Sequence, residues 1–330
     1  MISTVELPER PLVSIITPVL NREHSIHMCL SAVAAQSYSS IEHVVVDGGS
    51  TDGTIDILRR FRPRHAFRWL SESDRGMYDA LNKGLAMARG DVVAYLNSDD
   101  FYLPWSVEVA VEALGRGADV VYGDLGLLQV RSDNRSTFYV QFYPPFDLTY
   151  YTHVGTLAQP TVFWRREVTE RIGGFDSDYR LIGDCEYWLR AAVAGASLVH
   201  EEEVLAIQID HEDTLRATNP GGLEAEFRRL RGTYSTKARP PSRPRADAAL
   251  KSLRWRWLQL RFAMETYRRE PARWPRFIRF LKDSRINVTR PARALASLLP
   301  ARFRPGWAMH IDKSMVEGKL LELIGASTAP

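Results

Sequence analysis

Short, largely apolar runs recur through the first hundred residues, and stretches with helical periodicity separate them. Such runs are typical of strands that are covered on both faces of a sheet. They occupy residues 12–17, 41–46, 67–70 and 91–96. Amphipathic stretches that predict helices follow at residues 26–33, 55–61 and 76–88. This alternation of strand and helix at short spacing predicts an α/β fold with a parallel sheet wound by helices.

The pattern loosens after Trp105, where strands follow one another with fewer helices between them. We expect strands at residues 120–122, 127–130, 137–142, 161–164 and 204–209. We expect helices at residues 107–114, 166–172 and 183–194. Consecutive strands of this kind favour antiparallel pairing, so the sheet as a whole is predicted to be mixed and flanked by helices.

The composition is that of an ordinary soluble protein, with 45% apolar and 25% charged residues among 330. The two cysteines, Cys29 and Cys185, fall in predicted helices and have no metal-binding spacing, so we expect buried thiols in a reducing compartment. The first ten residues lack a basic stretch followed by an apolar one, so we expect no secretory signal. No apolar run approaches the roughly 18 residues that span a bilayer. A cytoplasmic location is the expectation.

Charge is distributed unevenly along the chain. Residues 236–310 carry 19 Lys or Arg and 4 Asp or Glu, a net charge of +15, which leaves −12 on the remainder of a chain whose net charge is +3. A run rich in Pro and Arg, K-A-R-P-P-S-R-P-R, begins at Lys237 and reads as a linker. We therefore expect a domain at residues 1–234 and a basic, helical region at residues 235–330.

Within that basic region, residues 251–285 interleave Trp, Phe and Leu with Arg. This pattern is typical of helices that lie at a membrane interface on anionic lipid, which predicts peripheral attachment to an inner membrane face. A helical appendage packed on the acidic body and a homodimer contact are the alternatives. Nucleic acid would also suit basic and aromatic residues, but it fits the body poorly, and we expect no nucleic-acid partner.

Polar residues that could bind a ligand or take part in catalysis follow three of the predicted strands. Asn97, Ser98 and Asp99 come directly after the fourth strand, where carboxylate and amide oxygens suit a divalent cation and a phosphate. A turn rich in Gly and Asp begins at Asp47, and it matches neither a dinucleotide fingerprint nor a P-loop. Arg75 lies just ahead of a helix that opens at the same edge and Lys83 lies within it, where cations could bind a diphosphate.

Six motifs in order resemble the family 2 glycosyltransferases of the GT-A fold. They are I-I-T-P-V-L-N-R-E (15–23), V-V-V-D-G-G-S-T-D-G-T (44–54), S-E-S-D-R-G-M-Y-D-A-L-N-K-G (71–84), G-D-V-V-A-Y-L-N-S-D-D (90–100), G-G-F-D (173–176) and G-D-C-E-Y-W-L-R (183–190). The resemblance covers roughly residues 11–215. Each motif is weak alone, and the set in this order is specific.

The resemblance implies a role for each matching residue. Asp184 aligns with the catalytic base, and Asp99 with the metal-binding acid of a D-x-D motif. His211 falls where some members supply a metal-binding histidine, and Asp47 is expected on uracil. The nucleotide-sugar site is expected to include Thr17, Pro18, Glu23, Asp47, Gly49, Ser50, Asp52, Arg75, Asn82, Lys83, Asn97, Ser98 and Asp99. The acceptor side is expected to include Asp176, Glu186 and Trp188, the last against a sugar face or in the core.

Two positions depart from the family's pattern. Asn97 stands where the first acid of D-x-D is expected, and an amide brings no charge to a metal. Gly183 stands where an acid precedes the catalytic base. These departures keep a non-catalytic nucleotide- or glycan-binding protein open as an alternative. Replacing Asp184 by Asn separates the two, because a true base is needed for turnover and not for nucleotide binding.

The resemblance therefore implies an inverting glycosyltransferase that uses a nucleotide sugar, a UDP-sugar above all, and Mg²⁺ or Mn²⁺. The expected acceptor is a hydroxyl of a glycan, a lipid-linked saccharide or a glycolipid. The cation would stabilise the departing diphosphate, and the base would deprotonate the attacking hydroxyl. A nucleotidyltransferase is the second alternative. It would need a loop rich in Gly and in Lys or Arg after the first strand, which T-P-V-L-N-R-E does not provide.

Overall fold

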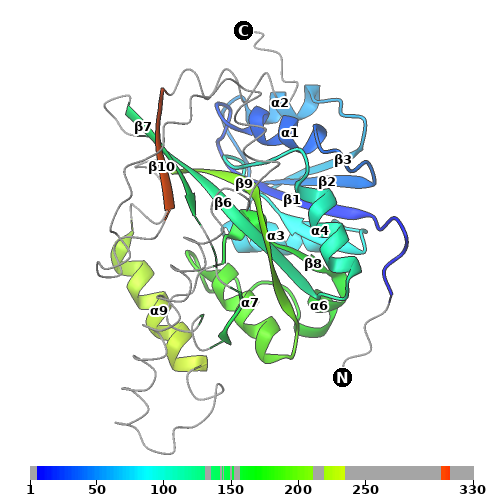
Figure 1. Ribbon diagram of the computed structural model, residues 1–330. Coiled ribbons are helices and arrows are strands. Elements are labelled where there is room, and N and C mark those ends of the chain that lie inside the picture. Colours follow the sequence, from blue (N-terminus) through cyan, green and yellow to red (C-terminus); the bar gives the residue numbers. More distant parts are fainter. Residues whose placement is uncertain are drawn as a thin grey trace, which may run out of the picture.

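The computed structural model is built around one large mixed sheet (Figure 1). It describes residues 6–130, 135–141, 143, 145–148, 151, 157–210, 219–234 and 306–312. The strands follow the order β10-β7-β6-β8-β4-β1-β2-β3, and β9 joins at β6 while also pairing with β5. The predicted α/β architecture is confirmed for the part of the chain that these ranges cover.

The parallel half of the sheet carries the first part of the chain. Its strands are β1 (Val13–Val19), β2 (Ile41–Asp47), β3 (Ala66–Ser71) and β4 (Val92–Tyr95). Strand β1 pairs in parallel with both β2 and β4, and β2 pairs in parallel with β3. Because all four strands point the same way, their carboxyl ends meet at one edge, and the chain order reverses beside β1. Open α/β sheets bind ligands at such an edge.

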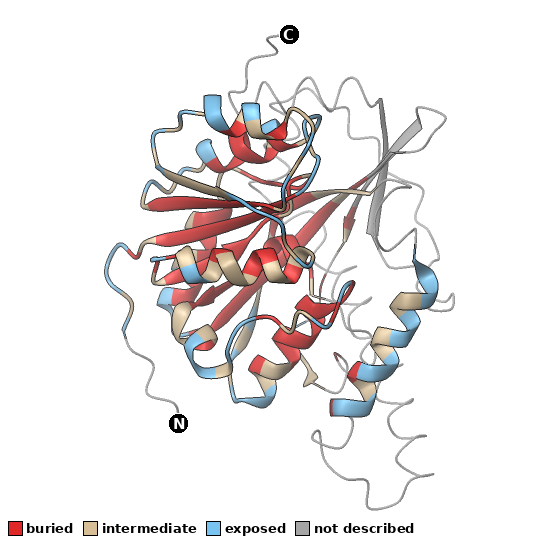
Figure 2. Ribbon diagram, turned by 180° about the vertical axis from the view of Figure 1, so that it is seen from behind, coloured by how far each residue is buried: buried red, intermediate tan, exposed pale blue. Residues whose placement is uncertain are grey.

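Helices follow these strands as the apolar periodicity predicts. They are α1 (Ile26–Ala34), α2 (Thr54–Arg60) and α3 (Met77–Met87). Every residue of β1 and β2 is buried, and α3 packs on both strands (Figure 2). Since both faces are covered, the strands are continuous apolar runs rather than alternating ones.

The second half of the sheet is antiparallel where it joins the first. Strand β8 (Phe163–Arg165) pairs antiparallel with β4 and with β6 (Val120–Val130), which the sequence had suggested as two strands. Strand β7 (Arg135–Gln141) pairs with β6, and β9 (Leu198–Asp210) runs parallel to β6 through a bulge. A short β5 (Phe101–Tyr102) pairs with β9. The remaining elements here are α4 (Ser106–Gly115), η1 (Gln159–Thr161), α6 (Arg166–Ile172) and α7 (Gly183–Val193).

Two elements lie outside the sequence prediction. Helix α9 (Pro220–Tyr234) lies beside α7 and is exposed over most of its length (Figure 2). Strand β10 (Gly306–Asp312) pairs antiparallel with β7 and extends the sheet, although residues 235–330 were expected to be helical. For residues 306–312 that expectation is wrong, because a sheet edge offers unpaired backbone groups that a strand can use. The linker and residues 251–285 lie outside the described ranges.

Both cysteines are buried thiols, as expected, and neither forms a disulfide. Within the described ranges, no helix combines the length and the apolar character needed to cross a membrane.

Candidate functional site

Two loops at the carboxyl edge of the sheet are joined by hydrogen bonds. The backbone N–H of Glu23 donates to Asp52 Oδ2 at 3.1 Å, and Glu23 Oε2 accepts from the N–H of Gly53 at 2.7 Å. Asn21, which adopts a positive φ of 50°, accepts from the N–H of Thr51 at 2.8 Å through Oδ1. The acids of both predicted motifs therefore hold the loops after β1 and β2 against each other.

Asp47 shapes the loop that follows β2. Its Oδ2 accepts from the N–H groups of Gly49 and Ser50, each at 3.0 Å, and from Ser71 Oγ at 2.7 Å. Oδ1 accepts from Ser50 Oγ, and the side chain is fully buried. Asp47 thus lies under the loop, not on its surface. Its expected contact with uracil stays a prediction.

Thr17 faces the interior at the end of β1. Its hydroxyl is hydrogen-bonded to His43 Nε2 at 2.9 Å and lies 3.7 Å from Cys29 Sγ. Burial lowers the pKa of His43 to about 3, so the imidazole is neutral. The side chain of Thr17 is therefore engaged in the core beneath the edge where it was expected to border a nucleotide. Pro18, the next residue, also belongs to β1.

Of the cations predicted near a diphosphate, Arg75 lies just ahead of α3 and Lys83 lies within it. Arg75 donates to Asp79 Oδ1 at 2.9 Å, and this hydrogen bond holds the pKa of Asp79 below its usual value. Lys83 Nζ lies 2.8 Å from a carboxylate oxygen of Glu72 and donates to the carbonyl of Ser73 at 3.0 Å. Both cations are partly solvent-accessible, and the ion pair of Lys83 with the exposed Glu72 can be exchanged for a phosphate at little cost.

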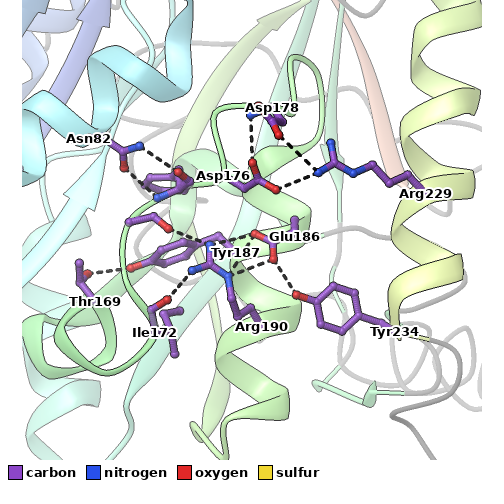
Figure 3. A network of polar contacts seen from close by, with 12 residues as sticks. Asn82, Thr169, Ile172, Asp176, Asp178, Glu186, Tyr187, Arg190, Arg229 and Tyr234 are labelled. Atoms are coloured by element: carbon purple, nitrogen blue, oxygen red, sulfur yellow. Dashed lines mark hydrogen bonds and ion pairs between the residues drawn. The ribbon is translucent and has the colours of Figure 1, made fainter.

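Asn82 does not face the same way as these cations. Its Nδ2 donates to the carbonyl of Phe175 and its Oδ1 accepts from the N–H of Phe175, both at 2.8 Å. Both ends of the amide are thus engaged with the backbone of the G-G-F-D segment, as Figure 3 shows. The structure thus places Asn82 as a link between α3 and the predicted acceptor side, and its role at the nucleotide stays a prediction.

Hydrogen bonds to two neighbouring side chains fix the orientation of the Asn97 amide. Its Nδ2 donates to Asp100 Oδ2 at 3.1 Å and to Gln159 Oε1 at 3.0 Å. Gln159 is itself oriented, because its Nε2 donates to the carbonyl of Tyr95 at 3.1 Å. A carboxylate at position 97 would meet two acceptors here. The departure from an acid is therefore explained by the buried Asp100 beside it.

The remaining oxygen of Asn97 is a fitting cation ligand. Oδ1 is buried and has no hydrogen-bond partner within the described ranges. Asp99, two residues on, has a side chain that is 23% exposed and lies 4.0 Å from Arg22 Nε. An amide oxygen and one carboxylate suit Mg²⁺ or Mn²⁺, whose other ligands come from water and substrate phosphates. Among the residues with described placement, no cluster of three His, Cys, Asp or Glu side chains forms a ready-made site, and His211 lies outside them.

Asp184 is the second residue of α7, and its side chain is mostly buried, the residue being 5% exposed. Tyr78, from the first turn of α3, donates its hydroxyl to Asp184 Oδ1 at 3.2 Å. A Cβ at Gly183 would lie 2.8 Å from Cε2 and Cζ of the Tyr78 ring. The second departure from the family's pattern therefore also has a local cause, since the ring fills the place of a side chain at position 183.

Two of the residues predicted on the acceptor side, Asp176 and Glu186, belong to a polar network that connects α7 and α9 (Figure 3). Glu186 accepts from Arg190 at 2.9 Å and from the hydroxyl of Tyr234 at 2.6 Å. Burial, with the Glu186 carboxylate beside it, raises the pKa of Tyr234 well above its usual value. Asp176 lies at the exposed end of the network and accepts from Arg229 at 3.2 Å. Glu186 is thus a buried structural acid, and Asp176 is the one exposed enough to meet a ligand.

Trp188 is 1% exposed and packs edge-on against Trp164, with ring centroids 5.1 Å apart. The prediction that it packs against a sugar face is wrong, because its ring is enclosed by other aromatic side chains. The core alternative holds.

The three predicted acids belong to one connected region of contacts. Asp99 reaches Arg22, in the loop that is joined to the one shaped by Asp47. That loop meets the start of α3, since a Cβ at Gly48 would touch the carboxylate of Asp74. Helix α3 in turn carries Tyr78, the partner of Asp184. Ser98, buried between Asn97 and Asp99, and Gly49, Ser50 and Asp52 complete the edge.

Three residues of this region had no place in the sequence prediction. Tyr78 lies in the motif at residues 71–84, and its hydroxyl at the start of a predicted helix could have marked it as a candidate site residue. Arg22 follows β1 in N-R-E, where a cation beside a predicted phosphate site was visible. Gln159 comes from η1 and has no local signal, because only the fold brings it 3.0 Å from Asn97.

Comparisons with known proteins show the family to which this chain is similar. The model of a family described as glycosyl transferase family 2 matches residues 14–173. A PGL/p-HBAD biosynthesis glycosyltransferase of Mycobacterium bovis is 32% identical over 185 residues, which are 54% of this chain and 69% of that protein. Glycosyltransferase AglE of Haloferax volcanii is 30% identical over 200 residues, which are 59% of this chain and 66% of AglE.

Solved structures share the fold. Mannosyltransferase PcManGT from Pyrobaculum calidifontis, in complex with GDP-Man and Mn²⁺, superposes with a TM-score of 0.55 at 21% identity, covering 80% of this chain and 76% of that one. S. aureus TarS 1–349, in complex with UDP, gives a TM-score of 0.52 at 20% identity, covering 67% of this chain and 64% of that one. The predicted GT-A architecture is confirmed.

Proposed function

The chain belongs to glycosyl transferase family 2, and we propose that it transfers a sugar with inversion from a nucleotide diphosphate sugar to an acceptor hydroxyl. A UDP-sugar is the proposed donor. The proposed acceptor is a glycan, a lipid-linked saccharide or a glycolipid. The observation that carries the proposal is Asp184, a buried carboxylate at the start of α7 that an oriented phenol holds in place.

The donor is proposed to lie along the edge that ends β1, β2 and β4. Backbone amides of the loop after β2, ordered by Asp47, would meet the nucleoside. Arg75 and Lys83 would approach the diphosphate by leaving Asp79 and Glu72. Solved relatives of this fold hold UDP or GDP-Man, and the choice of uridine rests on the family resemblance of the motifs.

Asn97 Oδ1 and Asp99 would hold Mg²⁺ or Mn²⁺, which would stabilise the negative charge that develops on the leaving diphosphate. Asp184 would accept the proton of the acceptor hydroxyl as its oxygen attacks the anomeric carbon. The bond from that carbon to the diphosphate breaks on the opposite face, and its electrons leave with the diphosphate. A single displacement of this kind inverts the anomeric configuration.

The main rival is a non-catalytic binding protein, which the two departures from the family's pattern suggested. Both departures now have local causes, Asp100 beside Asn97 and Tyr78 beside Gly183. Neither therefore argues for a loss of catalysis.

The test is Asp184→Asn in the full chain. A screen of nucleotide sugars by thermal shift with Mn²⁺ first selects the donor, and release of the nucleoside diphosphate is then followed. Loss of a general base is expected to lower kcat by roughly 10²–10⁴-fold, while calorimetric binding of the donor persists. Asp178→Asn is the matched control, since this acid is exposed on the loop ahead of α7. Unchanged turnover in Asp184→Asn would refute the assignment.

We also propose that residues 251–285 attach the protein to an anionic membrane surface, near a lipid-linked acceptor. The proposal rests on the interleaved Trp, Phe and Arg of that segment. Sedimentation with phosphatidylcholine vesicles, with and without phosphatidylglycerol, tests it on the full chain. Replacing Arg254, Arg256, Arg268 and Arg269 together by Gln should abolish binding to the anionic vesicles. Equal sedimentation of the two proteins would contradict the proposal.

A further inference from the structure

Tyr78 is held in place from several sides. It lies at the start of α3 and is 2% exposed. Its ring stacks on that of Phe175, with centroids 5.8 Å apart and planes 27° apart. Phe175 is in turn fixed by the two hydrogen bonds of its backbone to Asn82. The hydroxyl of Tyr78 therefore has little freedom to move away from Asp184.

Gly183 is shaped by the same ring. A Cβ there would approach Cε2 and Cζ of Tyr78 to 2.8 Å and Cδ2 to 2.9 Å, closer than real side chains pack. The residue type at position 183 and the position of the Tyr78 ring therefore depend on each other. As long as the ring occupies this place, position 183 accepts only glycine, and the acid of the family's pattern has no room.

We propose that Tyr78 is a positioning residue for Asp184, and that Gly183 is the gap that admits it. The inference rests on the proposed function, because it needs Asp184 to be the base. The phenol donates to Oδ1 at 3.2 Å and so sets the rotation of the carboxylate. Oδ2 is the oxygen we assign to the acceptor's proton. The acceptor O–H bond breaks, a new O–H bond forms on Oδ2, and Tyr78 keeps its own proton.

A purely structural reading of Tyr78 predicts something different. A buried hydroxyl without a catalytic role would affect stability alone, and its removal would leave turnover per folded molecule unchanged. A positioning role predicts a lower kcat with the KM of the donor preserved, because the carboxylate acts in the transition state and the donor binds elsewhere along the edge. The values of kcat and of the donor KM in a Tyr78 variant therefore distinguish a structural role from a positioning role.

The decisive variant is Tyr78→Phe, which keeps the ring and its stacking. A hydrogen bond to a charged group is lost, so kcat is expected to fall by about 10- to 100-fold, with the donor KM and the dissociation constant of UDP unchanged. Tyr187→Phe is the matched control. That hydroxyl is buried in the same aromatic cluster, bonds Thr169 Oγ1 at 2.7 Å, and its ring stacks on Phe175 at 4.2 Å. The control should lose some stability and keep its kcat.

Gly183→Ala provides a second measurement on the same contact. Its methyl group displaces the ring, so it should lower kcat in the wild-type background and have little further effect on kcat in the Tyr78→Phe background. If Asp184→Asn stops turnover while Tyr78→Phe keeps the wild-type kcat, the proposed function stands and this inference is overturned. A loss of melting temperature and UDP affinity in Tyr78→Phe with no change of kcat overturns it as well. If Asp184→Asn turns over normally, the proposed function itself fails.

Discussion

The amide of Asn97 donates one of its N–H groups to the carboxylate of Asp100 across 3.1 Å. Asp100 is 1% exposed, and its other oxygen accepts from the backbone N–H of Ile209 in β9 at 3.3 Å. This pair ties the end of β4 to the last strand of the body. It also leaves Asn97 Oδ1 without a hydrogen-bond partner among the residues that the structure describes.

The change Asn97→Asp restores the acid of the family's pattern and is expected to destabilise the protein. It places a second carboxylate against Asp100 and removes the donor that Gln159 Oε1 uses. We expect a loss of about 2 kcal/mol or more in the free energy of unfolding, measured by urea denaturation at pH 7. Asp99→Asn is the matched control. Its side chain is partly exposed, so stability should hold while turnover that depends on Mn²⁺ falls. Equal stability of Asn97→Asp and the wild type would contradict this account of position 97.

Asn82 is expected to matter for stability more than for nucleotide binding. In Asn82→Ala, the N–H and the carbonyl of Phe175 both lose their partner. Two buried backbone groups without partners predict a loss of about 2–4 kcal/mol in the free energy of unfolding, with the calorimetric affinity for UDP unchanged in the folded fraction. Lys83→Gln should behave in the opposite way, with stability kept and affinity reduced. A large loss of UDP affinity in Asn82→Ala alone would favour direct contact with the nucleotide.

Glu226 in α9 accepts hydrogen bonds from three successive backbone amides just ahead of α7. Its carboxylate accepts from the N–H groups of Arg180, Leu181 and Ile182 at 2.7, 3.0 and 3.0 Å. Glu226→Ala should release them, and we expect hydrogen–deuterium exchange of these three amides to accelerate. Because this segment leads directly into Asp184, kcat should fall as well. Glu224→Ala on the same helix is the control, since that exposed acid forms ion pairs with Arg228 and Arg231 of α9 itself. Unchanged exchange in Glu226→Ala would show that α9 does not hold this segment.

Acid should destabilise the folded chain through His43. Burial, together with the ring of His65 beside it at a centroid distance of 6.1 Å, lowers the pKa of this imidazole from 6.5 to about 3. The unfolded chain therefore binds a proton below pH 6.5 that the folded chain binds only near pH 3. The free energy of unfolding must fall as the pH drops through this window, by up to about 2 kcal/mol between pH 7 and pH 5.

The measurement is urea denaturation at both pH values, with His43→Gln as the comparison. Gln can still bond the hydroxyl of Thr17 and does not titrate, so the variant should lose less stability on acidification than the wild type. Parallel pH dependence in the two proteins would rule out His43 as the source.

The alternation of strands and helices, the edge at which the polar motifs lie, and the family could all be predicted from the sequence. Those properties are local, since burial on both faces makes a strand apolar throughout, and motif spacing lies within one strand, turn and helix. The sequence could not predict which polar side chains of the motifs form hydrogen bonds within the protein, because these bonds depend on the fold. Asn82 and Phe175 are 93 residues apart, and Tyr78 and Asp184 are 106 residues apart. Buried polar groups must find partners wherever the fold brings them, so their roles follow from contacts that no stretch of sequence contains.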